Sequence, residues 1–414
     1  MTLQSNHPGI DWQAGSWQAA DPAPSAAEIV IAGDWAPIRR FAPLMDQTPT
    51  AVYGDLLPEL RAGDLRIVNL ECPLSTAGAP LVKSGTVLRG DPGQVRGLTT
   101  VPFEVAALAN NHSFDYGSQA FRQTRELLHE HRIRTVGAGM NAAEAAEPLI
   151  VSVNRLKIGI INFSEGEDLT AAEGERPGVM GWAIERLAAI IQKLRAKVQG
   201  VVVICHGGLE YLPFPPPYVA AALQRLADAG ADLIIGHHPH VPQGIEIHGG
   251  VPICYSLGNF VFYQPTDLLF RKLGYLVRAG FNSRGLARLQ VLPYEIASQG
   301  LRLLKDHPRA WAFKQLQEIS APLARPEGIR QAWNGFLAYN GVEGFRGEVA
   351  KIMDQLTRDP AKGAAMFRNR LTTLQHRHHW LDTLTRLMEH KLDEAPPWAR
   401  SWAEEYFTRK QWPV

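Results

Sequence analysis

The stretch GADLIIGHHPHVPQGIE, residues 230–246, runs from an apolar segment through a glycine into three histidines within four positions. Residues 231–238 have the composition of a buried strand, and His237, His238 and His240 stand where that strand would end. Such a segment is either a polar loop that happens to be rich in histidine or a cluster of ligands. The ends of the other predicted strands distinguish these two interpretations.

Several other segments have the apolar, β-branched pattern of buried strands. They are residues 28–34, 65–71, 156–163, 201–208 and 252–259, together with the first part of 101–117. Helical periodicity lies between several of them, for example at 183–198 and 218–229. Apolar strands that alternate with helices predict an α/β fold whose sheets are covered on both faces.

Polar side chains follow nearly every one of these segments. They are Asp34, Glu71, Asn111, His112, His206, His238, His240 and Asn259. In open α/β sheets, binding sites form at the carboxyl ends of the strands. Strand ends that each supply a carboxylate, a carboxamide or an imidazole therefore predict one shared site, which favours the ligand-cluster interpretation of residues 237–240.

Composition narrows the class of protein. The formal net charge of +1 gives no indication of a nucleic-acid partner or of an anionic membrane surface. The 3 cysteines do not suggest a disulfide framework, and no run of ~18 apolar residues predicts a membrane span. The first residues lack the basic and apolar segments of a signal peptide. We therefore expect a cytoplasmic protein.

The pattern divides the chain into three parts. Residues 1–27 are predicted to be a flexible leader rich in alanine and proline, and residues 28–304 form the α/β domain. Residues 305–414 are predicted to be a helical C-terminal extension, in which the cluster HRHHW, residues 376–380, lies on a solvated helix face.

The residue types at the strand ends indicate the chemistry. Carboxylates, a carboxamide and imidazoles together suit a borderline divalent metal such as Mn, Zn or Fe. A carboxylate can bridge two such ions about 3.5–4 Å apart, and a pair of ions can hold the attacking and leaving oxygens of a phosphoester.

Six motifs in order carry a resemblance to a known family. They are GD (33–34), NLE (69–71), NNHSFDYG (110–117), HGGLEY (206–211), GHHPHVPQG (236–244) and YSLGNF (255–260). The chain from about residue 28 to residue 300 resembles the CapA-type poly-γ-glutamate capsule synthesis proteins of the calcineurin-like metallophosphoesterase superfamily. The resemblance implies a metallophosphoesterase-like β-sandwich flanked by helices.

The resemblance also implies roles for individual residues. It implies these metal ligands: Asp34, Glu71, Asn111, His206, His238 and His240. It further implies that His112 is the catalytic acid that protonates a leaving group. If a ligand is lost, Asp34 and one histidine, either His206, His238 or His240, are instead candidates for acid–base catalysis without metal. His237 is the additional histidine, and we expect it to lie behind the ligands or at the surface.

The sequence departs from the superfamily at two of these positions. Ala36 stands where the first motif usually has a histidine, and Glu71 is longer than the usual bridging aspartate. One ion would keep four ligands, namely Glu71, Asn111, His206 and His238. The other would keep only Asp34, Glu71 and His240. One ion is therefore favoured over two, and a site without metal remains an alternative.

Four further residues are candidates for binding substrate. Lys83 and Arg89 could hold a phosphate or carboxylate, although a solvated loop is the simpler interpretation. Glu210 and Asn259 could contact substrate or orient the metal ligands.

Three functions fit these features. The first is a metal-dependent hydrolase that acts on a phosphoester or on a peptide or poly-γ-glutamate-like chain. The second is a metal-independent epimerase, in which Asp34 and a histidine on opposite sides of a carbon exchange protons. The third is a capsule-assembly component without turnover. The expected partner is accordingly a small molecule, a peptide or an acidic polymer.

Overall fold

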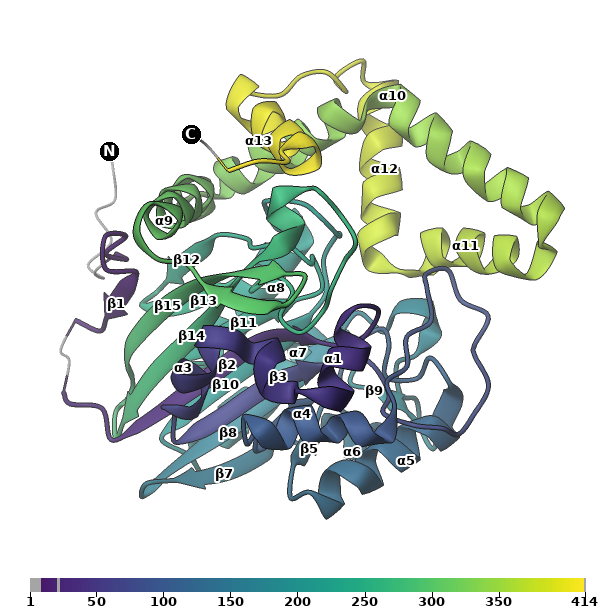
Figure 1. Cartoon of the computed structure of the whole chain (residues 1–414). Helices are drawn as coiled ribbons and strands as arrows, with labels where there is room; N and C mark the ends of the chain where they lie inside the picture. Colours follow the sequence, from purple (N-terminus) through teal and green to yellow (C-terminus); the bar gives the residue numbers. More distant parts are fainter. Residues whose placement is uncertain (1–8, 21–22, 413–414) are drawn as a thin grey trace.

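The computed structural model describes residues 9–20 and 23–412, and two β-sheets form its centre (Figure 1). The first sheet contains, in spatial order, β1 (Ser16–Gln18), β15 (Gly285–Ala297), β14 (Leu273–Asn282), β2 (Ala27–Trp35), β3 (Leu65–Leu70), β4 (Val105–Ala107) and β5 (Arg134–Val136), with β16 (Gly300–Leu303) paired to β15. The second contains β12 (Ile245–His248), β13 (Val251–Cys254), β11 (Leu233–His237), β10 (Gly200–His206), β8 (Leu156–Ser164) and β7 (Leu149–Val153). A small separate pair is formed by β6 (Ala138–Gly139) and β9 (Gly178–Val179).

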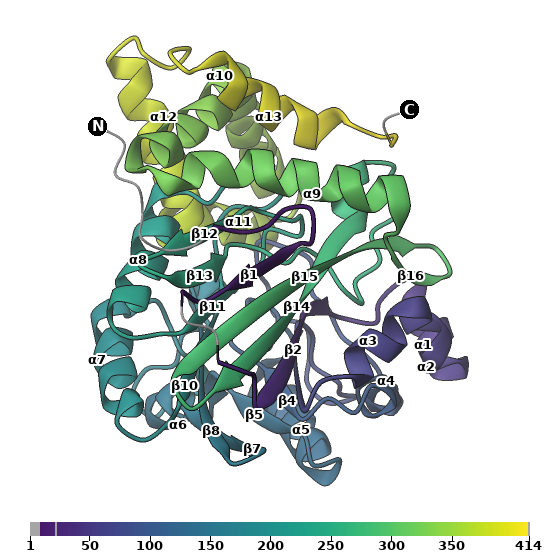
Figure 2. The same cartoon turned by 90° about the vertical axis from the view of Figure 1, so that its left-hand side faces the viewer.

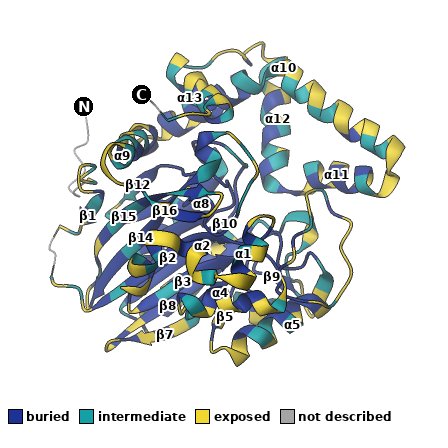
Figure 3. Cartoon of the chain, in the orientation of Figure 1, coloured by how far each residue is buried: buried dark blue, intermediate teal, exposed yellow. Residues whose placement is uncertain are grey.

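Alternation along each strand separates the apolar core into layers. In β2, Ile29 and Ile31 belong to the cluster that also contains residues of the second sheet, whereas Val30 and Ala32 belong to the cluster under the outer helices. Because successive side chains of a strand point to opposite faces, the first sheet is buried on both sides. Figure 3 shows these strands as buried and the helices around them as exposed on their outer faces. The predicted α/β fold is confirmed.

Helices cover both outer faces of the two sheets. The first sheet is covered by α1 (Phe41–Gln47), α2 (Pro49–Tyr53), α3 (Leu57–Arg61), α4 (Val95–Thr100) and α5 (Gly117–Glu130). The second is covered by α7 (Ile184–Arg195) and α8 (Pro217–Asp228), which match the helices expected at 183–198 and 218–229, and α6 (Ala142–Ala146) packs beside β6.

Strand direction brings the predicted polar residues to one edge. The strands β2, β3, β4 and β5 run parallel, as do β8, β10, β11 and β13. Parallel strands have their carboxyl ends on the same side of the sheet, so the residues that follow them converge.

Part of the expected N-terminal leader belongs to the first sheet. Residues Ser16–Gln18 form β1, which pairs antiparallel with β15 (Figure 2), and Trp17 is only 3% exposed. Burial of an indole ring fixes this segment, so the expectation of a flexible leader is wrong for residues 9–20. Residues 1–8 and 21–22 lie outside the described residues.

The region after β16 is helical, as predicted. It contains α9 (Asp306–Ser320), α10 (Pro326–Arg358), α11 (Pro360–Thr372), α12 (Leu374–Met388) and α13 (Pro397–Thr408). Figure 1 shows α9 and α13 close to the sheets, while α10, α11 and α12 form an arm on the same side of the molecule. Within residues 9–20 and 23–412, none of the helices has the length and apolar character needed to cross a membrane.

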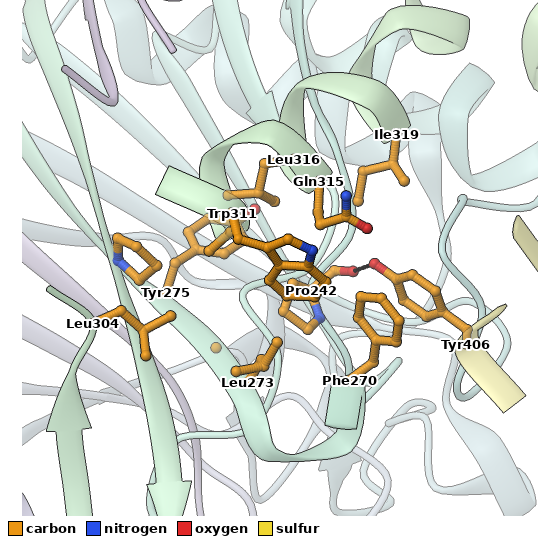
Figure 4. Close-up of a pocket in the computed structure, with 13 residues that line it drawn as sticks. Pro242, Phe270, Leu273, Tyr275, Leu304, Trp311, Gln315, Leu316, Ile319 and Tyr406 are labelled. Atoms are coloured by element: carbon orange, nitrogen blue, oxygen red, sulfur yellow. Dashed lines mark hydrogen bonds between the residues drawn. The ribbon is translucent and has the colours of Figure 1, made fainter. Parts of the chain in front are cut away.

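A small apolar pocket lies where α9 and α13 meet the first sheet (Figure 4). Its wall includes Tyr406 of α13, which stacks on Phe270 with 3.9 Å between ring centroids and donates a 2.9 Å hydrogen bond to the carbonyl of Pro242. Pro242 lies two residues after His240. The helical extension is therefore attached to the segment that carries the histidines.

Acidification is expected to loosen α12. Burial lowers the pKa of His379 to about 4, so the cluster at 376–380 is not simply a solvated helix face. Between pH ~6.5 and 4 the unfolded chain binds a proton that the folded chain excludes, and stability falls by up to ~1.4 kcal/mol per pH unit. Hydrogen exchange of α12 amides should be faster at pH 5 than at pH 7.5, and less pH-dependent in His379→Gln. The same pH dependence in both proteins would contradict this.

Candidate metal centre

The polar residues at the strand ends form one buried cluster. Asp34 belongs to β2, Glu71 follows β3, and His206 ends β10, while His238 and His240 follow β11. Each of these five side chains is at most 3% exposed. The structure therefore brings together residues as far apart in the chain as Asp34 and His240, as the strand-end argument predicted.

Three ligand-type atoms from other residues lie close to Nε2 of His206. Its Nε2 lies 3.0 Å from Asn111 Oδ1, 3.1 Å from His238 Nδ1 and 3.3 Å from Glu71 Oε1. Protein ligands lie roughly 2.0–2.2 Å from a Zn-like ion, which places neighbouring ligand atoms about 3.0–3.5 Å apart at octahedral or tetrahedral angles. The spacing of these atoms thus fits a shared cation.

Glu71 gives independent support for a cation. Its side chain is 0% exposed, and neither carboxylate oxygen has a hydrogen-bond partner among the described residues. Burial, followed by the neighbouring Asp34 carboxylate, raises the pKa of Glu71 well above its usual value. A buried carboxylate is costly unless it is paired or binds a metal, so these residues fit a divalent ion.

A second group of ligand-type atoms is less suited to a cation. Asp34, Glu71 and His240 place one such atom each within 4.8 Å of one another. Burial alone would lower the pKa of His240, but Glu71 and Asp34 raise it to about 10. Its Nδ1 lies 2.8 Å from Asn259 Oδ1 and 3.4 Å from Asp34 Oδ2. A protonated imidazole between two carboxylates can itself supply positive charge there, which favours one strong metal site over two.

His237 and Asn69 surround Asp34. His237 is 1% exposed, with Nδ1 3.2 Å from Asp34 Oδ1, so the surface position considered for this histidine is wrong. Asn69 Nδ2 donates a 2.8 Å hydrogen bond to the same carboxylate oxygen. Against the raising effect of burial, His237 and His240 keep the pKa of Asp34 well below its usual value. Asn69 was not among the predicted site residues, although it begins the motif NLE.

Backbone geometry at the site is unusual. His238 and His240 have φ of 98° and 57°, in the left-handed region that side chains seldom adopt. Such conformations cost about 1–3 kcal/mol each and tend to occur at functional sites. Next to Asp34, a Cβ atom on Gly33 would lie 2.4 Å from the Gly258 carbonyl oxygen. Only glycine therefore allows the loop with Asn259 to approach β2 so closely.

His112 has a carboxylate partner that was not predicted. Its Nδ1 lies 2.6 Å from Asp115 Oδ2, and Asp115 Oδ1 accepts a 2.8 Å hydrogen bond from Lys83 Nζ. Burial, together with Lys83, lowers the pKa of His112, while Asp115 opposes that shift. A carboxylate on one ring nitrogen orients the imidazole and leaves its Nε2 for a reacting group. The i, i+3 spacing of His112 and Asp115 was the signal in the sequence.

Lys83, considered above as a substrate-binding residue or a solvated loop residue, is buried beside Asp115. The side chain is 4% exposed, and Nζ also donates a 2.6 Å hydrogen bond to the carbonyl of Asn111. It is a buried, paired side chain and not a solvated loop residue. Its charge instead stabilises Asp115 and fixes the backbone of a proposed ligand.

The other candidates for substrate binding occupy three different environments. Arg89 is exposed, with its guanidinium 4.3 Å from the centre of the Tyr116 ring, and its place is on the surface. Asn259 is fully buried and holds His240 through both its side-chain oxygen and a 3.2 Å hydrogen bond from Nδ2 to the His240 carbonyl. It therefore orients His240. Glu210 is half-buried, and one of its carboxylate oxygens lies within 4.8 Å of a ring nitrogen of His238 and of His240.

The helical extension reaches the cluster as well. A small pocket is lined by Asn111, Ser164, Glu165, Glu167, His206, Gly207, His238 and Gln375. Gln375 belongs to α12, and its side-chain amide contacts His238 Nε2. Neither the two glutamates nor Gln375 was predicted, because nothing in the local sequence shows that α12 returns to this edge.

Comparison with known families supports the sequence resemblance. The model described as bacterial capsule synthesis protein PGA_cap matches residues 28–264. The PGA biosynthesis protein CapA of Bacillus subtilis is 32% identical over 250 residues, covering 59% of this chain and 65% of that protein. The capsule biosynthesis protein CapA of Bacillus anthracis is 35% identical, with coverage of 49% and 50%. The chain thus spans about half to two thirds of these two relatives.

A further relative is matched over more of its length. The probable polyglutamine synthesis accessory protein of Mycobacterium tuberculosis is 31% identical over 300 residues, covering 67% of this chain and 77% of that protein. Among solved structures, a putative 5′-nucleotidase from Staphylococcus aureus has a TM-score of 0.42 at 16% identity, covering 70% of this chain and 58% of that one. A hypothetical protein from Thermus thermophilus has a TM-score of 0.43 at 14% identity, with coverage of 65% and 99%.

Proposed function

Because the chain belongs to the bacterial capsule synthesis protein family, we propose that it is a metal-dependent hydrolase that acts on a capsule-type substrate. The bond cleaved would be a phosphoester or an amide of a peptide or poly-γ-glutamate-like chain. The observation that carries this proposal is Glu71, a buried carboxylate without hydrogen-bond partners in the described chain, beside the ligand-type atoms of Asn111, His206 and His238.

The proposed division of roles follows from the contacts. Glu71, Asn111, His206 and His238 would hold the more tightly bound ion, of Mn, Zn or Fe type. A divalent ion in such a site polarises the scissile group and lowers the pKa of water. The residues of the chain exclude bulk water, since the side chains of the cluster are almost completely buried. Asp34 and His240 complete the charge balance beside Glu71.

His112 supplies the proton in this proposal. Asp115 holds Nδ1 of the ring, so Nε2 is the atom that would donate to the departing oxygen or nitrogen. Lys83 keeps Asp115 ionised through its own ion pair. Lys83, Asp115 and His112 thus act as a unit, in which His112 faces the substrate.

The alternative of a metal-independent epimerase requires Asp34 to remove a proton from carbon. The observed environment disfavours this role, because Asn69 and the two nearby histidines hold the Asp34 carboxylate and lower its pKa, which reduces its basicity. Elemental analysis of protein purified without chelator, followed by assays on bis-p-nitrophenyl phosphate and on a γ-glutamyl peptide, tests the proposal. EDTA-resistant exchange of the α-hydrogen of the γ-glutamyl peptide with deuterium, without cleavage of the peptide, would favour the epimerase. A metal-free protein without cleavage or exchange would favour an assembly role.

Metal titration is expected to show unequal sites. Metal-stripped protein should bind Mn²⁺ or Zn²⁺ in one tight step, because ligand-type atoms of Glu71, Asn111 and His238 already lie close to His206 Nε2. A second step should be weaker or absent, because His240 competes for the carboxylates of Asp34 and Glu71. Isothermal titration calorimetry measures both steps. Two tight steps of equal affinity would refute the argument.

A further inference from the structure

We propose that the C-terminal helical extension orients ligands of the metal centre, and that Gln375 is a positioning residue for His238. This inference rests on the proposed metal site and deepens it. The family match ends at residue 264, so the contacts concerned come from a region beyond the part of the chain that carries the motifs.

The contact between Gln375 and His238 is direct and buried. The side-chain nitrogen and oxygen of Gln375 lie 3.0 Å and 3.3 Å from His238 Nε2, and both side chains are 2% exposed. On the other side of the ring, His238 Nδ1 faces His206 Nε2 at 3.1 Å. If Nδ1 is to bind a cation, the proton must lie on Nε2, and the amide oxygen of Gln375 is then the group within hydrogen-bond distance that can accept it, since the amide nitrogen can only donate.

This arrangement has a known physical consequence. Ligating histidines usually donate their second N–H to an acceptor that fixes the tautomer and the ring orientation, and loss of that acceptor typically weakens metal binding 10–100-fold. Because His238 already has a backbone φ of 98°, the local chain alone does not provide an ordinary geometry for its side chain. The hydrogen bond from α12 supplies orientation that the loop does not.

A second connection runs from α11 to Asn111. Asn369 Nδ2 donates a 2.9 Å hydrogen bond to Glu167 Oε1, and Glu167 Oε2 accepts a 3.1 Å hydrogen bond from Asn111 Nδ2. With its amide nitrogen held in this way, Asn111 presents its oxygen towards His206. Asn369 is fully buried, and Glu167 is half-buried. Two proposed ligands are therefore oriented from two neighbouring helices of the extension.

Other contacts hold these helices in place. Gln375 N donates a 3.0 Å hydrogen bond to Glu165 Oε2, and the other oxygen of Glu165 accepts from Gly208 N at 2.7 Å. The ring of His378 stacks on Tyr218 at 4.5 Å with an interplanar angle of 8°. At the start of α11, Lys362 donates two 2.7 Å hydrogen bonds to backbone carbonyls of the 83–85 loop. The orienting contacts thus belong to a fixed interface.

The test measures Mn²⁺ affinity of the metal-stripped full-length chain by calorimetry and by Mn²⁺ electron paramagnetic resonance. Gln375→Leu should raise the dissociation constant of the tight site about 10–100-fold, because a similar volume is kept while the acceptor is lost. Gln375→Glu, which keeps an acceptor oxygen, should bind near the wild-type value. Arg377→Ala, on the exposed side of α12, is the matched control and should leave the affinity unchanged.

The outcomes separate this inference from the function on which it rests. Wild-type affinity in Gln375→Leu would overturn the positioning role while leaving the metal site intact. An equal loss in Gln375→Glu, accompanied by a fall in the melting temperature of the metal-free protein, would also overturn it, since α12 would then be only a structural support. Failure of the wild-type chain to bind Mn²⁺ would overturn the proposed function itself.

Discussion

Replacing His112 by alanine is expected to lower kcat by about 10²–10⁴-fold while leaving metal affinity close to the wild-type value. The reason is that His112 contacts Asp115 through Nδ1 and lies outside the ligand-type atoms around His206. A group that donates a proton only in the transition state contributes to turnover and little to the ground state. Steady-state kinetics on bis-p-nitrophenyl phosphate, with calorimetric Mn²⁺ titration of the same preparation, measure both quantities.

Two variants sharpen that experiment. Asp115→Asn should also lower kcat, because the carboxylate that stabilises the charged form of His112 is removed while the side-chain volume is kept. His129→Ala, an exposed histidine on α5, should leave both quantities unchanged. An active His112→Ala protein that has lost its metal would show that His112 is a ligand and that its role is wrongly assigned.

Replacing Glu71 by glutamine is expected to lower metal affinity by at least about 100-fold, which exceeds the usual effect of losing an outer hydrogen-bond partner. Glu71 is the one carboxylate that belongs to both of the groups near His206 and Asp34. Glutamine keeps the shape but carries no charge, so the main attraction for the cation is removed. The same change should make the metal-free protein more stable, because a buried carboxylate without a hydrogen-bond partner, next to the carboxylate of Asp34, is costly.

Comparison with His240→Ala provides the control for this prediction. His240 contributes to the second, weaker group, so its loss should reduce activity by an amount that excess metal partly restores. Glu71→Gln should show no such recovery over the same range of metal concentration. Calorimetry and thermal unfolding with and without Mn²⁺ measure these effects. A Glu71→Gln protein that binds Mn²⁺ as tightly as wild type would refute the metal centre described above.

The sequence alone determined where the site lies. Apolar strands such as 201–208 are recognisable without a structure, because burial on both faces requires an almost continuous apolar run. The polar residue that ends each run then lies at the carboxyl edge of a parallel sheet, where neighbouring strands place their own last residues. For this reason Asp34, Glu71 and His206 could be assigned to one cluster before their distances were known. The helical character of residues 305–414 was equally evident from local periodicity.

Only the tertiary structure decided what surrounds that cluster. The approach of Gln375 to His238, the burial of Lys83 against Asp115 and the position of His237 beside Asp34 all depend on packing between distant segments. Local sequence determines strand and helix because neighbouring residues share a backbone periodicity, but it carries no comparable signal for contacts between elements far apart in the chain. From the local sequence, Lys83 is therefore expected to be solvated, and only the packing of distant segments buries it. Gln375 is likewise expected to be an ordinary helix residue, and only the tertiary structure places it against His238.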